Sequence, residues 1–100
     1  MLLTNDERKA VERARATLAT LTPTTARDDA IAFDLRYASR HLAGAQAKSV
    51  SREAALNVLR AAALNALSAV AVSLDRRTLT QELIDMARLG VAAVLDQLSA

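Results

Sequence analysis

The residues best suited to chemistry lie in one short stretch of the first half of the chain. Asp34, Tyr37 and His41 follow one another at spacings of three and four residues, which places them on one face of a helix. Arg36 and Arg40 form an adjacent basic row. His41 is the only histidine of the chain, so it is the side chain through which phosphoryl transfer or RNA cleavage would run.

A single histidine on the second helix of a small four-helix bundle resembles the histidine phosphotransfer domains. The matching positions are Arg40, His41 and Gly44. That family usually has a lysine and then a glycine at the third and fourth positions after its histidine, where this chain has Gly44 and Ala45. The resemblance implies a signalling domain in which an exposed His41 accepts a phosphoryl group.

A second resemblance concerns the spacing from Arg36 to His41. This Arg-x-x-x-x-His pattern is similar to that of the helical ribonucleases of the toxin and defence class, although Tyr37 stands where that family usually has a polar residue. It implies RNA cleavage by Arg36 and His41 from one shared cleft. The simplest alternative, which we favour, is that His41 is a cation near a helix end that interacts with the last carbonyl groups.

Several kinds of site are excluded by residue type. The chain has no cysteine and a single histidine, so neither a thiolate nor a two-histidine metal site can be built within it. Gly44 and Gly90 are the only glycines, and neither lies in a phosphate-binding loop motif. We therefore expect no metal, no cofactor and no catalysis.

The composition indicates one small all-α domain over residues 1–100. The chain is rich in Ala and Leu, with only one Pro and two Gly. Its 13 basic and 11 acidic residues nearly balance, which argues against a nucleic-acid partner. The acidic residues near the N-terminus do not fit a secretory signal, and we expect a soluble cytoplasmic protein.

Capping and breaking residues divide the chain into four helices, at about residues 5–21, 25–43, 52–74 and 81–98. Their expected N-caps are Thr4, Thr25, Ser51 and Thr80. Gly44 is placed to close the second helix, unless Ala-Gln-Ala carries it further. Because the connections are short, we predict an up-down-up-down four-helix bundle.

Residues 53–74 are apolar on nearly every side of the helix that they form. The uncharged part, 61–74, spans only about 21 Å at 1.5 Å per residue, so we expect a core helix and no membrane span. One apolar seam of this helix can pack into the core. A second seam would stay exposed to solvent unless another helix or a second copy of the chain packs against it. We therefore predict a non-catalytic association module, a homodimer or a binder of another helical protein. The expected interface residues are Val58, Ala62, Ala69, Val72, Val91, Val94 and Leu98.

Overall fold

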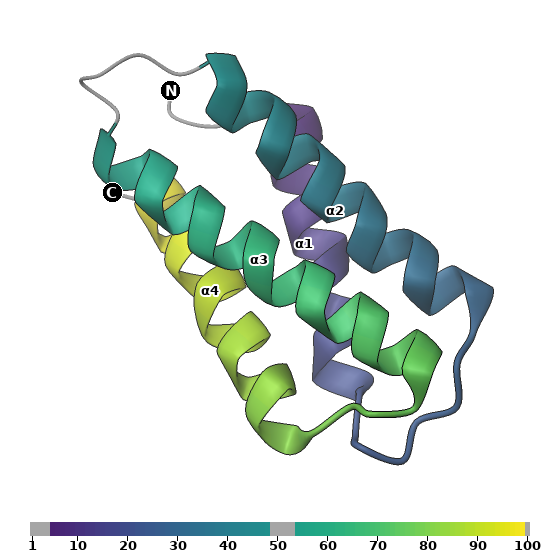
Figure 1. Cartoon of the computed structure of the whole chain (residues 1–100). Coiled ribbons are helices and arrows are strands. Elements are labelled where there is room, and N and C mark those ends of the chain that lie inside the picture. The colour runs from purple at the N-terminus through teal and green to yellow at the C-terminus, as the bar shows by residue number, and fades with distance from the viewer. Residues whose placement is uncertain (1–4, 49–53, 100) are drawn as a thin grey trace.

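The chain is a bundle of four helices. The computed structural model describes residues 5–48 and 54–99, which form α1 (Asn5–Thr20), α2 (Asp29–Lys48), α3 (Ala54–Arg76) and α4 (Gln81–Ser99). Successive helices run in opposite directions (Figure 1). Each helix packs against two others, in the closed order α1, α2, α3, α4 and back to α1, and the bundle measures 40 × 22 × 22 Å. The predicted all-α fold of four helices is confirmed.

The start of α2 differs from the prediction. Thr25 is not the cap, because it belongs to the preceding turn, where its backbone N–H donates to the Thr22 carbonyl at 3.1 Å. Asp28 caps the helix instead: its Oδ1 accepts from the Ala30 N–H at 2.7 Å, and its carbonyl accepts from the Ala32 N–H at 3.0 Å. The helix therefore begins at Asp29, four residues later than expected.

The end of α2 lies beyond residue 43. The helix continues to Lys48, and Gly44 does not have the positive φ that a helix-closing glycine adopts. The following Ala45, Gln46 and Ala47 are good helix formers, and they carry the backbone past the glycine.

A compact turn joins α3 to α4. Arg77 has a φ of 59°, and two hydrogen bonds close the helix: the Thr78 N–H donates to the Ser73 carbonyl at 2.8 Å, and the Arg77 N–H donates to the Leu74 carbonyl at 3.4 Å. This is the Schellman pattern with an arginine in the left-handed position. Thr80 then caps α4 as predicted, since its Oγ1 accepts from the Leu83 N–H at 3.2 Å. The expected caps Thr4 and Ser51 lie outside the described residues.

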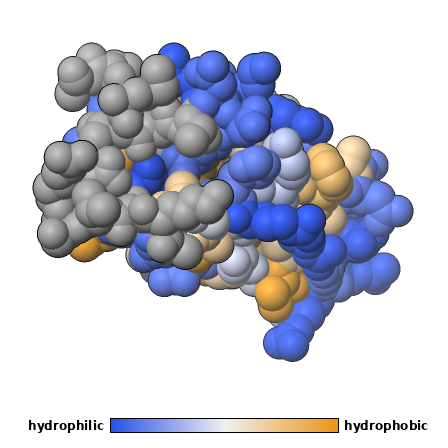
Figure 2. Space-filling view, turned by 90° about the horizontal axis from the view of Figure 1, so that it is seen from above, coloured by the Kyte–Doolittle hydropathy of each residue, from blue (hydrophilic) through white to orange (hydrophobic). Residues whose placement is uncertain are grey.

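The core is built from one apolar seam on each helix. The fully enclosed side chains include Val11, Leu18, Leu35, Leu42, Leu67, Val70, Ile84, Val91 and Val94. The second seam of α3 stays outside the core, with Val58 exposed by 68% and Val72 by 46%. Seen from above, hydrophobic residues reach the surface as separate patches among hydrophilic ones (Figure 2).

The backbones of α3 and α4 approach closely at Gly90. A Cβ atom at this position would lie 3.1 Å from the Cα atom of Ala63, which is tighter than an ordinary van der Waals contact. Nothing lies within 4 Å of the equivalent position at Gly44. The two glycines therefore have different roles. Gly90 permits the close approach of α3 and α4, whereas Gly44 only lowers the helix propensity of α2.

A buried ion pair joins α1 and α3 inside the bundle, toward the end where both helices begin. Arg60 Nη2 on α3 lies 3.2 Å from Glu7 Oε1 on α1, and the two side chains are only 3% and 1% exposed. Arg60 Nη1 also donates to Asn57 Oδ1 at 3.3 Å. The backbones of α1 and α3 do not come together in the described part of the chain, so these two long side chains join diagonal helices. No local pattern in the sequence links Glu7 with Arg60, because the two residues lie 53 positions apart along the chain.

The two glycines give a matched stability test. We expect Gly44→Ala to raise the free energy of unfolding by about 1 kcal/mol, because alanine is the better helix former and the site is open. Gly90→Ala should raise the free energy of unfolding by less than Gly44→Ala does, or lower it, because the added methyl group would lie too close to the α3 backbone. Chemical denaturation of both variants measures the difference, and an equal gain at the two sites would contradict the close approach at Gly90.

The buried pair gives a second test. Glu7→Leu or Arg60→Leu alone should cost about 3–5 kcal/mol, because each removes one charge of the pair while the opposite charge stays buried. The double variant should cost clearly less than the sum of the two. Asp85→Ala, which breaks the exposed Asp85–Arg88 pair, is the control and should cost about 1 kcal/mol or less. Strict additivity in a double-mutant cycle would show that the pair is not coupled.

Candidate functional site

Asp34 connects α2 to α1. Its Oδ1 lies 2.7 Å from Arg13 Nη2, and its Oδ2 accepts from the Thr17 hydroxyl at 2.8 Å. Both carboxylate oxygens are therefore engaged by α1, and Asp34 acts as a tie between two helices.

The two aromatic residues of the chain and its histidine form a ladder along α2. The rings of Phe33 and Tyr37 stack with centroids 5.4 Å apart and an interplanar angle of 14°. His41 meets Tyr37 edge-on at 4.5 Å. The guanidinium of Arg13 lies 5.6 Å from the centroids of both Phe33 and Tyr37, within cation–π range. His41 is half-buried at the end of this ladder.

The basic row of α2 faces the other neighbour, α3. Arg36 pairs with Asp75 near the end of α3, and Arg27 Nε donates to the other oxygen of Asp75 at 2.9 Å. Arg27 also pairs with Asp29. The hydrogen bond from Arg27, together with the charge of Arg36, holds the pKa of Asp75 below its ordinary value, and the hydrogen bonds to Asp29 and Asp75 raise the pKa of Arg27.

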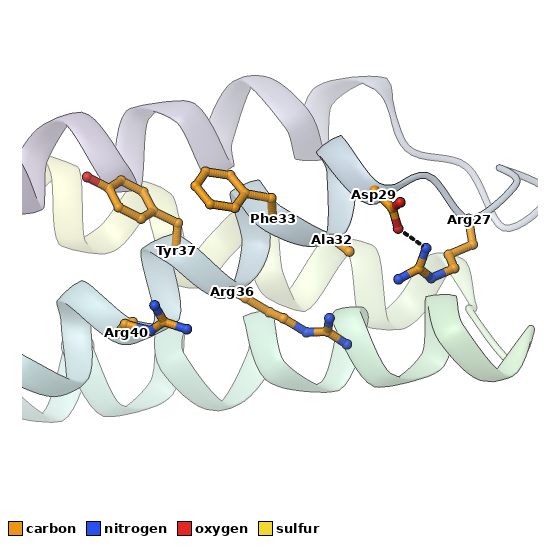
Figure 3. Close-up of a pocket in the computed structure, with 7 residues that line it drawn as sticks. All are labelled: Arg27, Asp29, Ala32, Phe33, Arg36, Tyr37 and Arg40. Atoms are coloured by element: carbon orange, nitrogen blue, oxygen red, sulfur yellow. Dashed lines mark hydrogen bonds and ion pairs between the residues drawn. The ribbon is translucent and has the colours of Figure 1, made fainter.

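A surface groove of about 210 Å³ lies between the aromatic ladder and this basic row. In Figure 3 the rings of Phe33 and Tyr37 lie on the α1 side of α2, and Arg36 extends toward α3. The lining residues are Arg27, Asp29, Ala32, Phe33, Arg36, Tyr37 and Arg40. His41 is not among them, so the groove that Arg36 lines does not bring Arg36 together with His41.

A second, larger hollow of about 500 Å³ adjoins the turn before α2. It is lined by Pro23, Thr24, Thr25, Ala26, Arg27, Leu74, Arg77 and Leu79. Arg27 belongs to both hollows, so its side chain connects them.

The residues predicted for an interface are divided by the structure. Val58 and Val72 are exposed, as is Ala62, and Ala69 is half-buried. Val91 and Val94 are fully buried in the monomer, so they are core residues and not part of an exposed face. Their place on the inward seam of α4, against α3 and α1, is the reason. The side chain of Leu98 lies outside the described residues.

Two general features complete the description. In the described ranges, no group of three or more His, Cys, Asp or Glu side chains could hold a metal ion. The helix α3 has the length and apolar composition of a membrane span, but here it is one wall of the bundle, and 33% of its most apolar window is buried. The core helices of soluble proteins can have the same length and composition.

No protein-family model, curated protein or solved structure matches this chain. The phosphotransfer and ribonuclease resemblances therefore remain hypotheses that rest on the residues of α2 alone.

Sequence reasoning grouped Asp34, Tyr37, His41, Arg36 and Arg40 correctly on one helix, but it missed what they contact. The missing partners lie 17 to 39 residues away along the chain: Arg13 and Thr17 on α1 contact Asp34, and Asp75 near the end of α3 pairs with Arg36. No local spacing links such residues, and only the packing of the helices brings them together.

The tie at Asp75 predicts a pH effect. A folded-state pKa below the usual 3.8 means that the unfolded chain binds the proton more tightly. The stability that Asp75 contributes through Arg27 and Arg36 is therefore fully present above the unfolded-state pKa. It is lost as the pH falls through the lowered folded-state pKa. NMR titration of the Asp75 carboxyl should show a larger upward pKa shift in Arg27→Gln than in Arg36→Gln. An unchanged pKa in Arg27→Gln would contradict the assignment.

Proposed function

We propose that this protein is a non-catalytic association module that forms a homodimer through the outer face of α3. The observation that supports the proposal is an outward stripe of five uncharged residues on α3, which we call the α3 stripe: Val58, Ala62, Asn65, Ala69 and Val72. Four of the five are exposed and the fifth is half-buried. An exposed face without charge, over about 21 Å of helix, is unusual for a monomeric protein.

The spacing within the α3 stripe favours a second copy of this chain as the partner. Val58 and Val72 each lie seven residues from Asn65, and Ala62 and Ala69 lie three and four residues from it. An antiparallel pair of α3 helices with its twofold axis at Asn65 would therefore set Val58 opposite Val72 of the second copy, and would bring Ala62 within one residue of the position opposite Ala69. Such self-complementarity is what a twofold interface requires.

The side chains of the stripe suit this pairing. The alanines allow the two helices to approach closely, and the valines close the contact at each end. Asn65 can hydrogen-bond to its symmetry mate, and a polar residue inside an apolar contact specifies the register. Met86 and Leu89 are exposed by 54% and 72%, so the neighbouring helix α4 also carries apolar side chains at the surface. Because few large side chains take part, we expect a dissociation constant in roughly the micromolar range.

Charge substitutions test both the dimer and its register. Sedimentation equilibrium of the wild type at about micromolar concentrations should show a reversible monomer–dimer equilibrium. Val58→Glu and Val72→Lys should each weaken the dimer by more than tenfold, because each buries two unpaired charges. The combined variant should recover much of the loss, because antiparallel pairing sets the two opposite charges against each other.

The control is Ala16→Glu, which places the same charge on the exposed face of α1 and should leave the dimer intact. A monomer at every concentration would overturn the proposed function. Failure of the combined variant to recover, when both single variants weaken the dimer, would overturn the antiparallel register.

A further inference from the structure

The groove on α2 combines an accessible aromatic surface with cations. Phe33 is 54% exposed although it is one of only two aromatic residues, and burying such a ring is normally favourable. Its ring is nearly parallel to that of Tyr37, and Arg13 on α1 packs against both rings. The fold thus holds two rings in one orientation at the surface.

A line of guanidinium groups runs beside these rings. Arg40, Arg36 and Arg27 line the groove, and Arg27 and Arg77 line the adjoining hollow. Asp29 and Asp75 fix Arg27 and Arg36 in place, so four cations face two anions and a net charge of +2 remains along the line. In the part of the chain that the structure describes, Arg40 and Arg77 take part in none of the ion pairs.

We propose that this surface binds single-stranded nucleic acid. One unstacked base packs against Phe33, and the adjoining phosphates lie along Arg40 and Arg36 toward Arg27 and Arg77. Aromatic side chains beside a cationic groove are the usual means by which proteins bind single strands without sequence readout. A duplex keeps its bases stacked on one another and offers none to the ring.

Two features favour an extended strand over a free nucleotide. The groove is open to solvent, and its volume of about 210 Å³ suits one base better than a whole enclosed ligand. The cations also continue past the groove into the second hollow, where further phosphates of a strand would lie. The near-balanced charge of the whole chain predicted no nucleic-acid partner. A bound strand, however, interacts mainly with the charges close to it, and these are positive along the groove.

The experiment is fluorescence anisotropy with labelled oligouridylate and oligothymidylate of about eight nucleotides at low salt. The wild type should bind the strands, and the comparison of RNA with DNA identifies the preferred sugar. Phe33→Leu, which keeps an apolar side chain but removes the ring, should weaken binding by about tenfold. Arg40→Gln should weaken binding severalfold. It should also reduce the slope of log affinity against log salt concentration by about one, because one phosphate contact is lost.

The matched control is Arg15→Gln, which removes an exposed arginine on α1 that lies outside both hollows. It should bind as the wild type does, and thermal unfolding checks that every variant is folded. No binding at about 100 µM protein would overturn the proposal. Equal losses in Arg40→Gln and Arg15→Gln, equal binding of a duplex, or full competition by uridine monophosphate at the concentration of the oligonucleotide would also overturn it.

Discussion

The ion pair between Glu7 and Arg60 is the constraint around which the bundle is arranged. Both side chains are nearly excluded from water, and the two opposite charges compensate each other. Because α1 and α3 lie diagonally across the bundle, the pair forms only at one relative axial position of the two helices and one rotation of each about its own axis. It therefore fixes the register of the first helix against the third, while the small side chains of the core are compatible with many registers.

The packing of α3 follows from this arrangement. One seam, with Leu67 and Val70, fills the core beside Arg60, and the close contact with Gly90 brings α4 against it. With its inward side so occupied, α3 turns its second seam outward. The α3 stripe is thus a consequence of how the helix is rotated, and the proposed dimer uses the surface that the monomer cannot cover.

A second surface, on the neighbouring helix α2, is organised by charge and aromatic contacts. Asp34 holds α2 to α1 through Arg13 and Thr17, and Asp75 holds it to α3 through Arg27 and Arg36. These ties set the side chains of the groove in place between the two neighbouring helices. The proposed dimer contact uses the α3 stripe, whereas the rings of the proposed nucleic-acid surface lie on α2 and its cations lie on α2, in the turn before it and just after α3.

The sequence by itself determined that there are four helices and where α4 begins, because apolar periodicity and capping are local properties of the chain. It misplaced the start of α2, where Asp28 outcompetes Thr25 for the cap. Only the tertiary structure decided that Glu7 and Arg60 are buried together, that Val91 and Val94 lie inside, and that Arg36 turns toward Asp75 rather than His41. The physical reason is that these outcomes depend on the rotation of each helix about its axis, which contacts between residues far apart in the chain determine.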